Sequence, residues 1–223
     1  MYNTVLFDLD GTLIDSAEGI TKCTQYALEK FNIEVTDRKD LYPFIGPPLK
    51  WSFMEYYGFD EEKADLAVEY YRERFSVKGM YEHQVYDGIE ELLKMLKERK
   101  VRLGVASSKN ELYVKLILED IKLDQYFDVI AGSLDEERSG KTEVIEAALS
   151  QWNIQDKSEI VMIGDRKFDI IGAKETELDS IGVLVGFGTR EELEDAGADQ
   201  IVASIWDLKE YLDENCESYE EKK

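Results

Sequence analysis

Short apolar runs recur along the chain and alternate with stretches whose apolar residues have helical spacing. The runs that we interpret as buried strands cover residues 4–9, 101–106, 127–131, 160–164 and 180–185, with a weaker one near 200–202. Single apolar helix faces occur in residues 88–99, 112–121, 143–152 and 205–212. Because strands alternate with helices, the pattern predicts an α/β fold, a Rossmann-like parallel sheet with helices on both faces.

The stretch from residue 15 to about residue 86 breaks this alternation, because it contains helical patterns and no convincing strand. Helices are predicted at 49–57 and 61–75, and an earlier one follows Asp15-x-x-Glu18, whose spacing resembles a capping box. We therefore expect an all-helical domain over residues 15–86, inserted into a core domain formed by residues 1–14 and 87–223.

Two segments are predicted to lack regular structure. Residues 42–48 must form a turn, because Gly46, Pro47 and Pro48 together disfavour helix and strand. The tail, residues 214–223, is polar and terminal, and we expect it to be frayed.

The composition indicates a globular chain with a strongly acidic surface. Of its 223 residues, 43% are hydrophobic, and 49 acidic residues outnumber 27 basic ones, which gives a formal charge of −22. Such a surface repels long nucleic acids and anionic membranes. The partner that we expect is a small phosphorylated metabolite, bound where positive charge is concentrated locally.

Neither the cysteines nor the N-terminus points to export. The chain has two cysteines, Cys23 and Cys216, and its first residues lack the basic and apolar regions of a signal peptide. No apolar run approaches the ~20 residues of a membrane span. We expect a cytoplasmic protein that works as a monomer or a weak homodimer.

The strongest chemical signal is the motif Asp8-Leu9-Asp10-Gly11-Thr12, directly after the first predicted strand. Two carboxylates at the end of a strand can project into the crevice where α/β sheets bind ligands. They can bind a hard cation, or one can attack phosphorus while the other transfers a proton. Gly11 allows a sharp exit from the strand.

A second acidic motif follows the strand predicted at 160–164. Asp165 and Asp169 are four residues apart at the start of a helix, so they share one helix face. Acids at a helix N-terminus also complement the helix dipole, and this alternative stays open. In combination with Asp8 and Asp10, the pair predicts a cation site of three or four carboxylates.

Carboxylates alone repel phosphate, so a phosphate site needs donors and positive charge beside them. Ser107 and Ser108 follow the strand predicted at 101–106, where hydroxyls and free amides can hold a phosphoryl oxygen. Lys141, at the start of a predicted helix, can supply a compact positive charge. The alternatives are a helix N-cap for Ser107 and a solvated surface lysine for Lys141.

Several other phosphate chemistries are excluded by the residues present. Gly140-Lys141-Thr142 looks like the end of a P-loop, but the earlier glycine that the motif requires falls at Asp135. His83 is the only histidine and lies outside any motif. Neither cysteine is followed six residues later by the arginine of a cysteine phosphatase loop.

In order and spacing, these motifs closely resemble the haloacid dehalogenase superfamily of phosphatases, over almost the whole chain. The first and last motifs, DLDGT and GDRKFD, are specific as a pair. The resemblance implies that Asp8 is the nucleophile, and that Asp10 protonates the leaving alcohol and then activates water. It also implies that Ser107 and Lys141 hold the transferring phosphoryl group.

The same resemblance implies a cofactor and a moving part. Mg²⁺ would be held by Asp8, by the backbone carbonyl of Asp10 and by Asp165, with Asp169 ligating it or ordering its waters. The helical insertion would be a mobile cap that closes over the substrate. Because members that cleave carbon–halogen bonds lack the second aspartate, Asp10 indicates phosphoryl transfer.

Within the superfamily, residues 44–49, 132–135 and 164–167 look most like a 5′-nucleotidase-like branch close to phosphoglycolate phosphatases. This resemblance implies a nucleoside 5′-monophosphate or phosphoglycolate as substrate. The residues expected to contact it are Gly11, Thr12, Ser108, Gly46, Lys50 and Arg166. Aromatic residues of the insertion either stack on a base or pack its helices together: Trp51, Phe53, Tyr56 and Tyr57.

Three rival functions remain open. A phosphomutase of the same fold would return the phosphoryl group to a sugar. A carbon–phosphorus hydrolase would need a reactive lysine in the insertion, for which Lys50 is the candidate. A non-catalytic binding protein on this scaffold would not need the whole set of acidic and basic residues.

Overall fold

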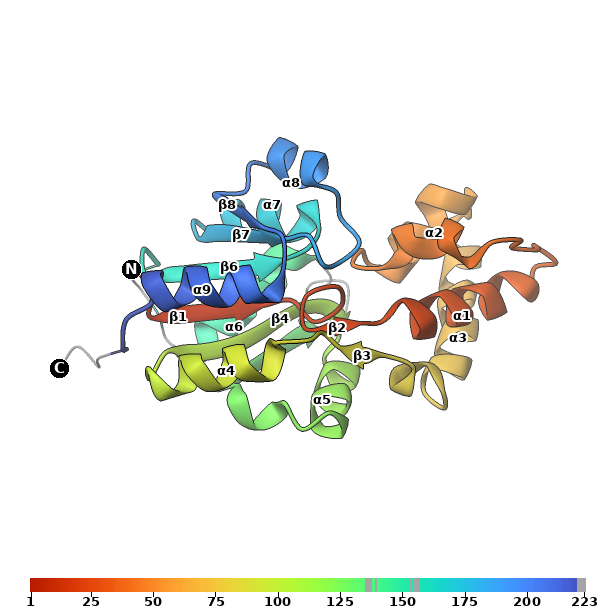
Figure 1. Ribbon diagram of the computed structural model, residues 1–223. Coiled ribbons are helices and arrows are strands. Elements are labelled where there is room, and N and C mark those ends of the chain that lie inside the picture. Colours follow the sequence, from red (N-terminus) through yellow and green to blue (C-terminus); the bar gives the residue numbers. More distant parts are fainter. Residues whose placement is uncertain (135–137, 139, 153, 155–156, 220–223) are drawn as a thin grey trace.

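A six-stranded parallel sheet forms the centre of the computed structural model (Figure 1), which describes residues 1–134, 138, 140–152, 154 and 157–219. In sheet order the strands are β5 (Val129–Ser133), β4 (Arg102–Asn110), β1 (Thr4–Phe7), β6 (Ile160–Gly164), β7 (Asp179–Val183) and β8 (Gln200–Val202). The chain moves outward in both directions from β1, so the strand order reverses there. Such a reversal leaves a crevice at the carboxyl ends of the strands.

Helices cover both faces of this sheet, and the alternation of side chains along β1 divides the core in two. Val5 and Phe7 point into the larger core, whereas Leu6 points to the opposite face. The larger core holds α4 (Ile89–Glu98), α5 (Glu111–Asp120) and α9 (Ile205–Asn215). The other face is covered by α6 (Lys141–Trp152) and α7 (Lys167–Glu175). The predicted α/β fold is confirmed.

Two short elements complete the α/β part of the chain. The helix α8 (Arg190–Ala196) packs on α7, and the 3-10 turn η3 (Asp124–Tyr126) connects α5 to β5. In the described part of the chain, no helix combines the length and the apolar character that crossing a membrane requires.

Between β1 and α4 the chain forms a separate group of helices, here called the helical insertion (residues 16–83; Figure 1). Its elements are α1 (Ala17–Glu29), η1 (Arg38–Phe44), α2 (Leu49–Tyr57), α3 (Glu61–Phe75) and η2 (Gly79–Tyr81). The bounds of α2 and α3 agree with the predicted ranges. Asp60 begins α3 by accepting a hydrogen bond from the Lys63 N–H at 2.9 Å, and Gly58 ends α2 in the left-handed conformation.

The expectation that residues 15–86 contain no strand was wrong. β2 (Ile14–Asp15) and β3 (Gln84–Val85) form a two-stranded antiparallel ladder at the base of the helical insertion. With two residues each, these strands are too short to produce a periodic pattern in the sequence. They bring the start and the end of the insertion together.

Two local predictions also need correction. The predicted turn at 42–48 begins too early, because Tyr42, Pro43 and Phe44 belong to η1. The capping box is absent: Ser16 is the N-cap of α1, and the Asp15 carboxylate accepts from the Ala17 N–H at 3.0 Å.

The tail is more ordered than expected. Helix α9 continues to Asn215, and the backbone of Cys216 forms an isolated parallel β-bridge with that of Tyr2. The guanidinium of Arg102 stacks on the ring of Tyr219 at 3.7 Å. Residues 220–223 lie outside the described residues, as do Asp135 and Ser139.

Candidate active site

The first acidic motif lies in a tight loop at the carboxyl end of β1. The Asp8 N–H still bonds the Ile163 carbonyl at 2.9 Å, after which the chain leaves the sheet. Gly11 turns the loop at a φ of 81°, a value that favours glycine. The strand therefore stops two residues before its predicted end, and both Asp8 and Asp10 are buried at the sheet edge.

Asp8 meets the second acidic motif at this edge. Asp8, Asp165 and Asp169 each offer a carboxylate oxygen, and these oxygens lie within 4.8 Å of one another. Burial raises the pKa of Asp8 to about 6, against the lowering effect of Lys141. Burial and the neighbouring Asp169 raise the pKa of Asp165 well above its usual range. The sequence motifs are thus brought together in three dimensions.

Lys141, the first residue of α6, supplies positive charge inside this cluster. Its ammonium lies 2.9 Å from Asp8 and 2.8 Å from Asp169, and it donates to the Ala106 carbonyl at 2.9 Å. Although burial opposes its charge, Asp169 and Asp8 hold the pKa of Lys141 above its ordinary value. The side chain is 3% exposed, so the alternative of a solvated surface lysine is excluded.

The cluster suits a divalent cation. Three carboxylates face one ammonium, which leaves an excess of negative charge in a buried site. Asp165 accepts from the Phe187 N–H at 2.7 Å through one oxygen, while its other oxygen is buried and has no hydrogen-bond partner among the described residues. Oxygen ligands of this kind are those that Mg²⁺ prefers. The residues that would hold the ion are Asp8, Asp165 and Asp169.

Asp169 also lies in the first turn of a helix, as the alternative interpretation of this motif proposed. Its carboxylate accepts from the Arg166 N–H at 3.0 Å, at the start of α7. One carboxylate oxygen therefore caps the helix while the other lies beside Lys141. The two interpretations are compatible.

Ser107 and Ser108 lie in an irregular part of β4. The register with β5 shifts between Ser107 and Asn110, which is the signature of a bulge. Ser107 is buried, and its hydroxyl accepts from the Lys109 N–H at 3.3 Å. The N-cap of α5 is Asn110, not Ser107, so that alternative was wrong.

Lys109 is a residue of the site that the sequence analysis missed. Its ammonium lies 2.8 Å and 3.0 Å from the two carboxylate oxygens of Asp10. The Asp10 carboxylate therefore pairs with Lys109 and is not part of the cluster formed by Asp8, Asp165 and Asp169. A lysine beside two serines carries no signal of its own, so its contact with Asp10 could not be predicted from the sequence.

A cavity of about 1050 Å³ lies between this edge of the sheet and the helical insertion. Asp10, Ser108, Lys109 and Lys141 line its core side. The insertion contributes the predicted residues Gly46 and Lys50, together with aromatic and apolar side chains that include Trp51, Met54, Tyr71 and Phe75. The Lys50 ammonium is paired with Asp65 at 3.0 Å.

The predicted aromatic residues of the insertion divide between cavity and packing. Trp51 is 39% exposed and meets Phe168 edge-to-face at 5.8 Å. Phe53 is fully buried against Phe44, and Tyr57 also packs on Phe44. Trp51 can therefore stack on a substrate, whereas the buried Phe53 cannot.

Three other predicted substrate contacts are not among the residues that line the cavity: Gly11, Thr12 and Arg166. Gly11 lies against the Asp165 carboxylate, and the buried Thr12 hydroxyl has no hydrogen-bond partner within the part of the chain that the structure describes. The Arg166 guanidinium donates to the Ile45 carbonyl at 2.6 Å and to Glu192 at 2.9 Å, which connects the α/β part to the insertion. Their contact with substrate stays a prediction.

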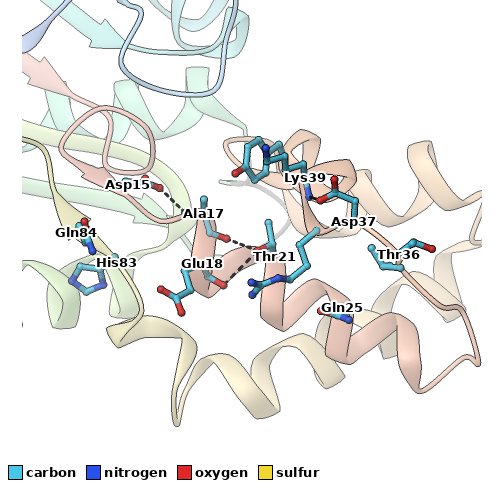
Figure 2. A pocket seen from close by; sticks show the side chains of 13 residues that line it. Asp15, Ala17, Glu18, Thr21, Gln25, Thr36, Asp37, Lys39, His83 and Gln84 are labelled. Atoms are coloured by element: carbon cyan, nitrogen blue, oxygen red, sulfur yellow. Dashed lines mark hydrogen bonds between the residues drawn. The ribbon is translucent and has the colours of Figure 1, made fainter.

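A second cavity, of about 730 Å³, lies beside α1 where the helical insertion joins the sheet (Figure 2). Asp15, Glu18, Asp37 and His83 are among the side chains that surround it. Burial lowers the pKa of His83. None of the predicted site residues lines this cavity, so the chemistry is concentrated at the first one.

Comparisons with known proteins agree with this geometry. The profile of the haloacid dehalogenase-like hydrolases matches residues 5–183, a range that contains all four motifs. A 5′-nucleotidase from Pseudomonas aeruginosa is 43% identical over 213 residues, covering 95% of this chain and 96% of that protein.

Two further similarities extend over nearly the whole chain. The crystal structure of a predicted phosphatase from Clostridium acetobutylicum has a TM-score of 0.93 and 54% identity, covering 96% of this chain and 99% of that one. The tyrosine-protein kinase PtkA from Mycobacterium tuberculosis is 35% identical over 211 residues, covering 93% of this chain and 72% of that protein.

Proposed function

Because this chain belongs to the haloacid dehalogenase-like hydrolases and is a phosphatase of that family, we propose that it hydrolyses a small phosphomonoester through a phosphorylated Asp8. The observation that carries the proposal is the position of the Asp8 carboxylate. It is buried beside Lys141, Asp165 and Asp169 at the sheet edge, where Asp10 and Lys141 line a large cavity.

In the first half-reaction, an Asp8 oxygen attacks phosphorus while the bond to the leaving oxygen breaks. Asp10 gives a proton to that oxygen, so the product leaves as an alcohol. In the second half-reaction, Asp10 takes a proton from water, whose oxygen attacks phosphorus and releases phosphate and Asp8. Lys141 offsets the charge of Asp8, and the Ser107 hydroxyl contacts a phosphoryl oxygen.

We propose Mg²⁺ as the cofactor, held by Asp8, Asp165 and Asp169, with the predicted contribution of the Asp10 backbone carbonyl. When bound, the ion neutralises charge on the transferring phosphoryl group. The proposal is supported by the excess of carboxylates over ammonium groups and by the Asp165 oxygen that has no hydrogen-bond partner in the described ranges.

We propose that the helical insertion acts as a cap and that the substrate is a nucleoside 5′-monophosphate. Two observations favour a nucleotide over phosphoglycolate. The cavity, at about 1050 Å³, is much larger than the volume of a phosphorylated two-carbon acid. The Pseudomonas aeruginosa relative is a 5′-nucleotidase. The carbon–phosphorus hydrolase is disfavoured, because the Lys50 side chain is held in ion pairs with Asp65 and Glu61, at 3.0 Å and 3.9 Å, on its own side of the cavity.

The test is the replacement Asp8→Asn, which keeps the shape of the side chain and removes the nucleophile. We expect phosphate release to fall by about 10³-fold or more, with the thermal unfolding transition retained. Borohydride reduction during turnover should convert Asp8 to homoserine in the wild type and not in the variant. Asp60→Asn is the matched control, because Asp60 is an exposed helix cap that asparagine replaces well. Phosphate release near the normal rate in Asp8→Asn would overturn the proposal.

A further inference from the structure

The two aspartates of the first motif, Asp8 and Asp10, contact different lysines. Lys141 lies beside Asp8, whereas the Lys109 ammonium contacts both carboxylate oxygens of Asp10, at 2.8 Å and 3.0 Å. The side chains of Lys109 and Asp10 are 10% and 7% exposed, so water screens this pair only weakly. Within the described residues, no other group forms a hydrogen bond to the Asp10 carboxylate.

Lys109 is itself held from two sides. The bulge between Ser107 and Asn110 displaces it from the regular ladder, and its N–H donates to the Ser107 hydroxyl at 3.3 Å. On the other side, its ammonium lies 4.8 Å from the centre of the Phe75 ring, a cation–π distance. Phe75 is the last residue of α3, so Lys109 lies between the sheet edge and the helical insertion.

Packing fixes the ring that Lys109 contacts. Phe75 stacks on Tyr71 at 5.3 Å and meets Tyr113 of α5 edge-to-face at 5.1 Å. Phe75 is buried. The ammonium therefore has a defined place, and it defines the rotamer of the carboxylate that it contacts.

We propose that Lys109 is a positioning residue for Asp10, which it holds in the orientation that proton transfer to the leaving oxygen requires. The inference rests on the proposed role of Asp10 as the acid and base. A proton donor must lie about 2.6–3.2 Å from the atom that it protonates, and a loop aspartate without a partner samples several rotamers. Lys109 transfers no proton: the proton passes from Asp10 to the leaving oxygen and, in the second half-reaction, from water to Asp10.

This role differs from that of a lysine that binds the substrate, although Lys109 also lines the cavity. A lysine that binds the phosphate group contributes equally to kcat/KM for all substrates that carry the same phosphate group. A lysine that positions the acid matters more as the leaving group becomes more basic, because poor leaving groups depend on protonation. The dependence of kcat/KM on the leaving group therefore separates the two roles.

The experiment measures kcat/KM for phosphate esters whose leaving groups range from p-nitrophenol to a simple alcohol. For Lys109→Met, which keeps an apolar side chain against Phe75, we expect a loss of about tenfold with p-nitrophenyl phosphate and about 100-fold or more with the alkyl phosphate. Lys109→Arg should recover part of the alkyl phosphate activity. Lys115→Met is the matched control, since Lys115 lies on the exposed side of α5 and pairs with Glu111.

Asp10→Asn separates the inference from the proposed function. Asp10→Asn should show the same dependence on the leaving group, and adding Lys109→Met to it should cause no further loss. A loss equal for all substrates in Lys109→Met and Lys109→Gln, beside a graded loss in Asp10→Asn, would overturn the inference alone. A loss in Asp10→Asn that is independent of the leaving group would overturn the proposed function, and the inference with it.

Discussion

At the scale of single residues, the candidate site depends on how closely the backbone of one motif approaches the carboxylates of another. Gly11 has a φ of 81°, and a Cβ at this position would overlap the Asp165 carboxylate. Gly58, at the end of α2, has a φ of 62° with open space where a Cβ would be. The two glycines share a backbone conformation and differ in what surrounds them.

This pair gives a residue-scale prediction. Gly58→Ala should lose about 1 kcal/mol of stability, because alanine is strained at positive φ. Gly11→Ala should lose more, because its Cβ also overlaps the buried Asp165 carboxylate. Only Gly11→Ala should also displace Asp165, and we expect its kcat/KM to fall by about tenfold or more. Thermal unfolding and phosphate release check the two parts. Equal activity of both variants would contradict the role given to the close approach at Gly11.

At the scale of secondary-structure elements, Glu82 connects three segments of the helical insertion. Its carboxylate accepts from the Arg74 guanidinium of α3 at 2.7 Å and 3.0 Å, and from Lys22 of α1 at 3.1 Å. The hydrogen bond from Arg74 is the main cause that lowers the pKa of Glu82 to about 2. Glu82 lies just before β3, so these contacts fix the end of the insertion to its helices.

The lowered pKa predicts how stability depends on pH. A depressed carboxylate pKa stabilises the folded state fully above the unfolded pKa of 4.5, and this contribution is lost as the pH falls toward 2. Glu82→Gln should therefore cost about 1 kcal/mol at neutral pH, a difference that shrinks between pH 5 and pH 2. Urea unfolding across this range measures it.

The control for Glu82 is an exposed pair on α4. Glu90 contacts Lys94 at 2.7 Å, but both side chains are more than half exposed. Glu90→Gln should leave the stability nearly unchanged at every pH. If the difference between Glu82→Gln and the wild type were constant from pH 7 to pH 2, the contacts of Glu82 would not be electrostatic in origin.

The elements that could be predicted from the sequence are those whose ends carry local signals. Pro48 and Gly58 bound α2, and Asp60 begins α3, so both helices have the predicted bounds. β2 and β3 could not be predicted, because pairing between residues far apart in sequence defines them. The seven residues of α8 likewise give no periodic pattern.

The site shows the same division between local and long-range information. The spacing of Asp8 and Asp10 after an apolar run is a local signal, as is Asp165 after the apolar run at residues 160–164. The contact between Lys109 and Asp10 depends instead on a bulge in β4 and on a ring from α3. Such a contact follows only from the packed structure.

At the scale of the whole molecule, the formal charge of −22 opposes folding through repulsion between like charges. At about 0.1 M ionic strength the screening length is ~10 Å, so added NaCl should raise the melting temperature. The buried cluster of Asp8, Asp165 and Asp169 adds a local term that a monovalent salt does not relieve.

Mg²⁺ should therefore stabilise the protein beyond the effect of ionic strength. With MgCl₂ at ~100 times its dissociation constant and matched ionic strength, we expect about 2.7 kcal/mol of extra stability, or about 5–10 °C in Tm. Asp165→Asn should lose this increment and keep the response to NaCl, whereas Asp60→Asn should keep both. Differential scanning calorimetry measures both responses, and equal increments in all three proteins would argue against a metal at the cluster.

The two-stranded ladder of β2 and β3 has a consequence for how such a molecule can change. Ile14 pairs with Val85 and Asp15 with Gln84, so the chain departs from and returns to the sheet domain at neighbouring positions. For a segment anchored in this way, the entropic cost of closing the loop grows only slowly with the length of the segment. Residues 16–83 can be lengthened, shortened or exchanged without altering the register of β1 with β4 and β6. Selection for new substrates can thus act on one segment while the carboxylates at the end of β1 are inherited unchanged.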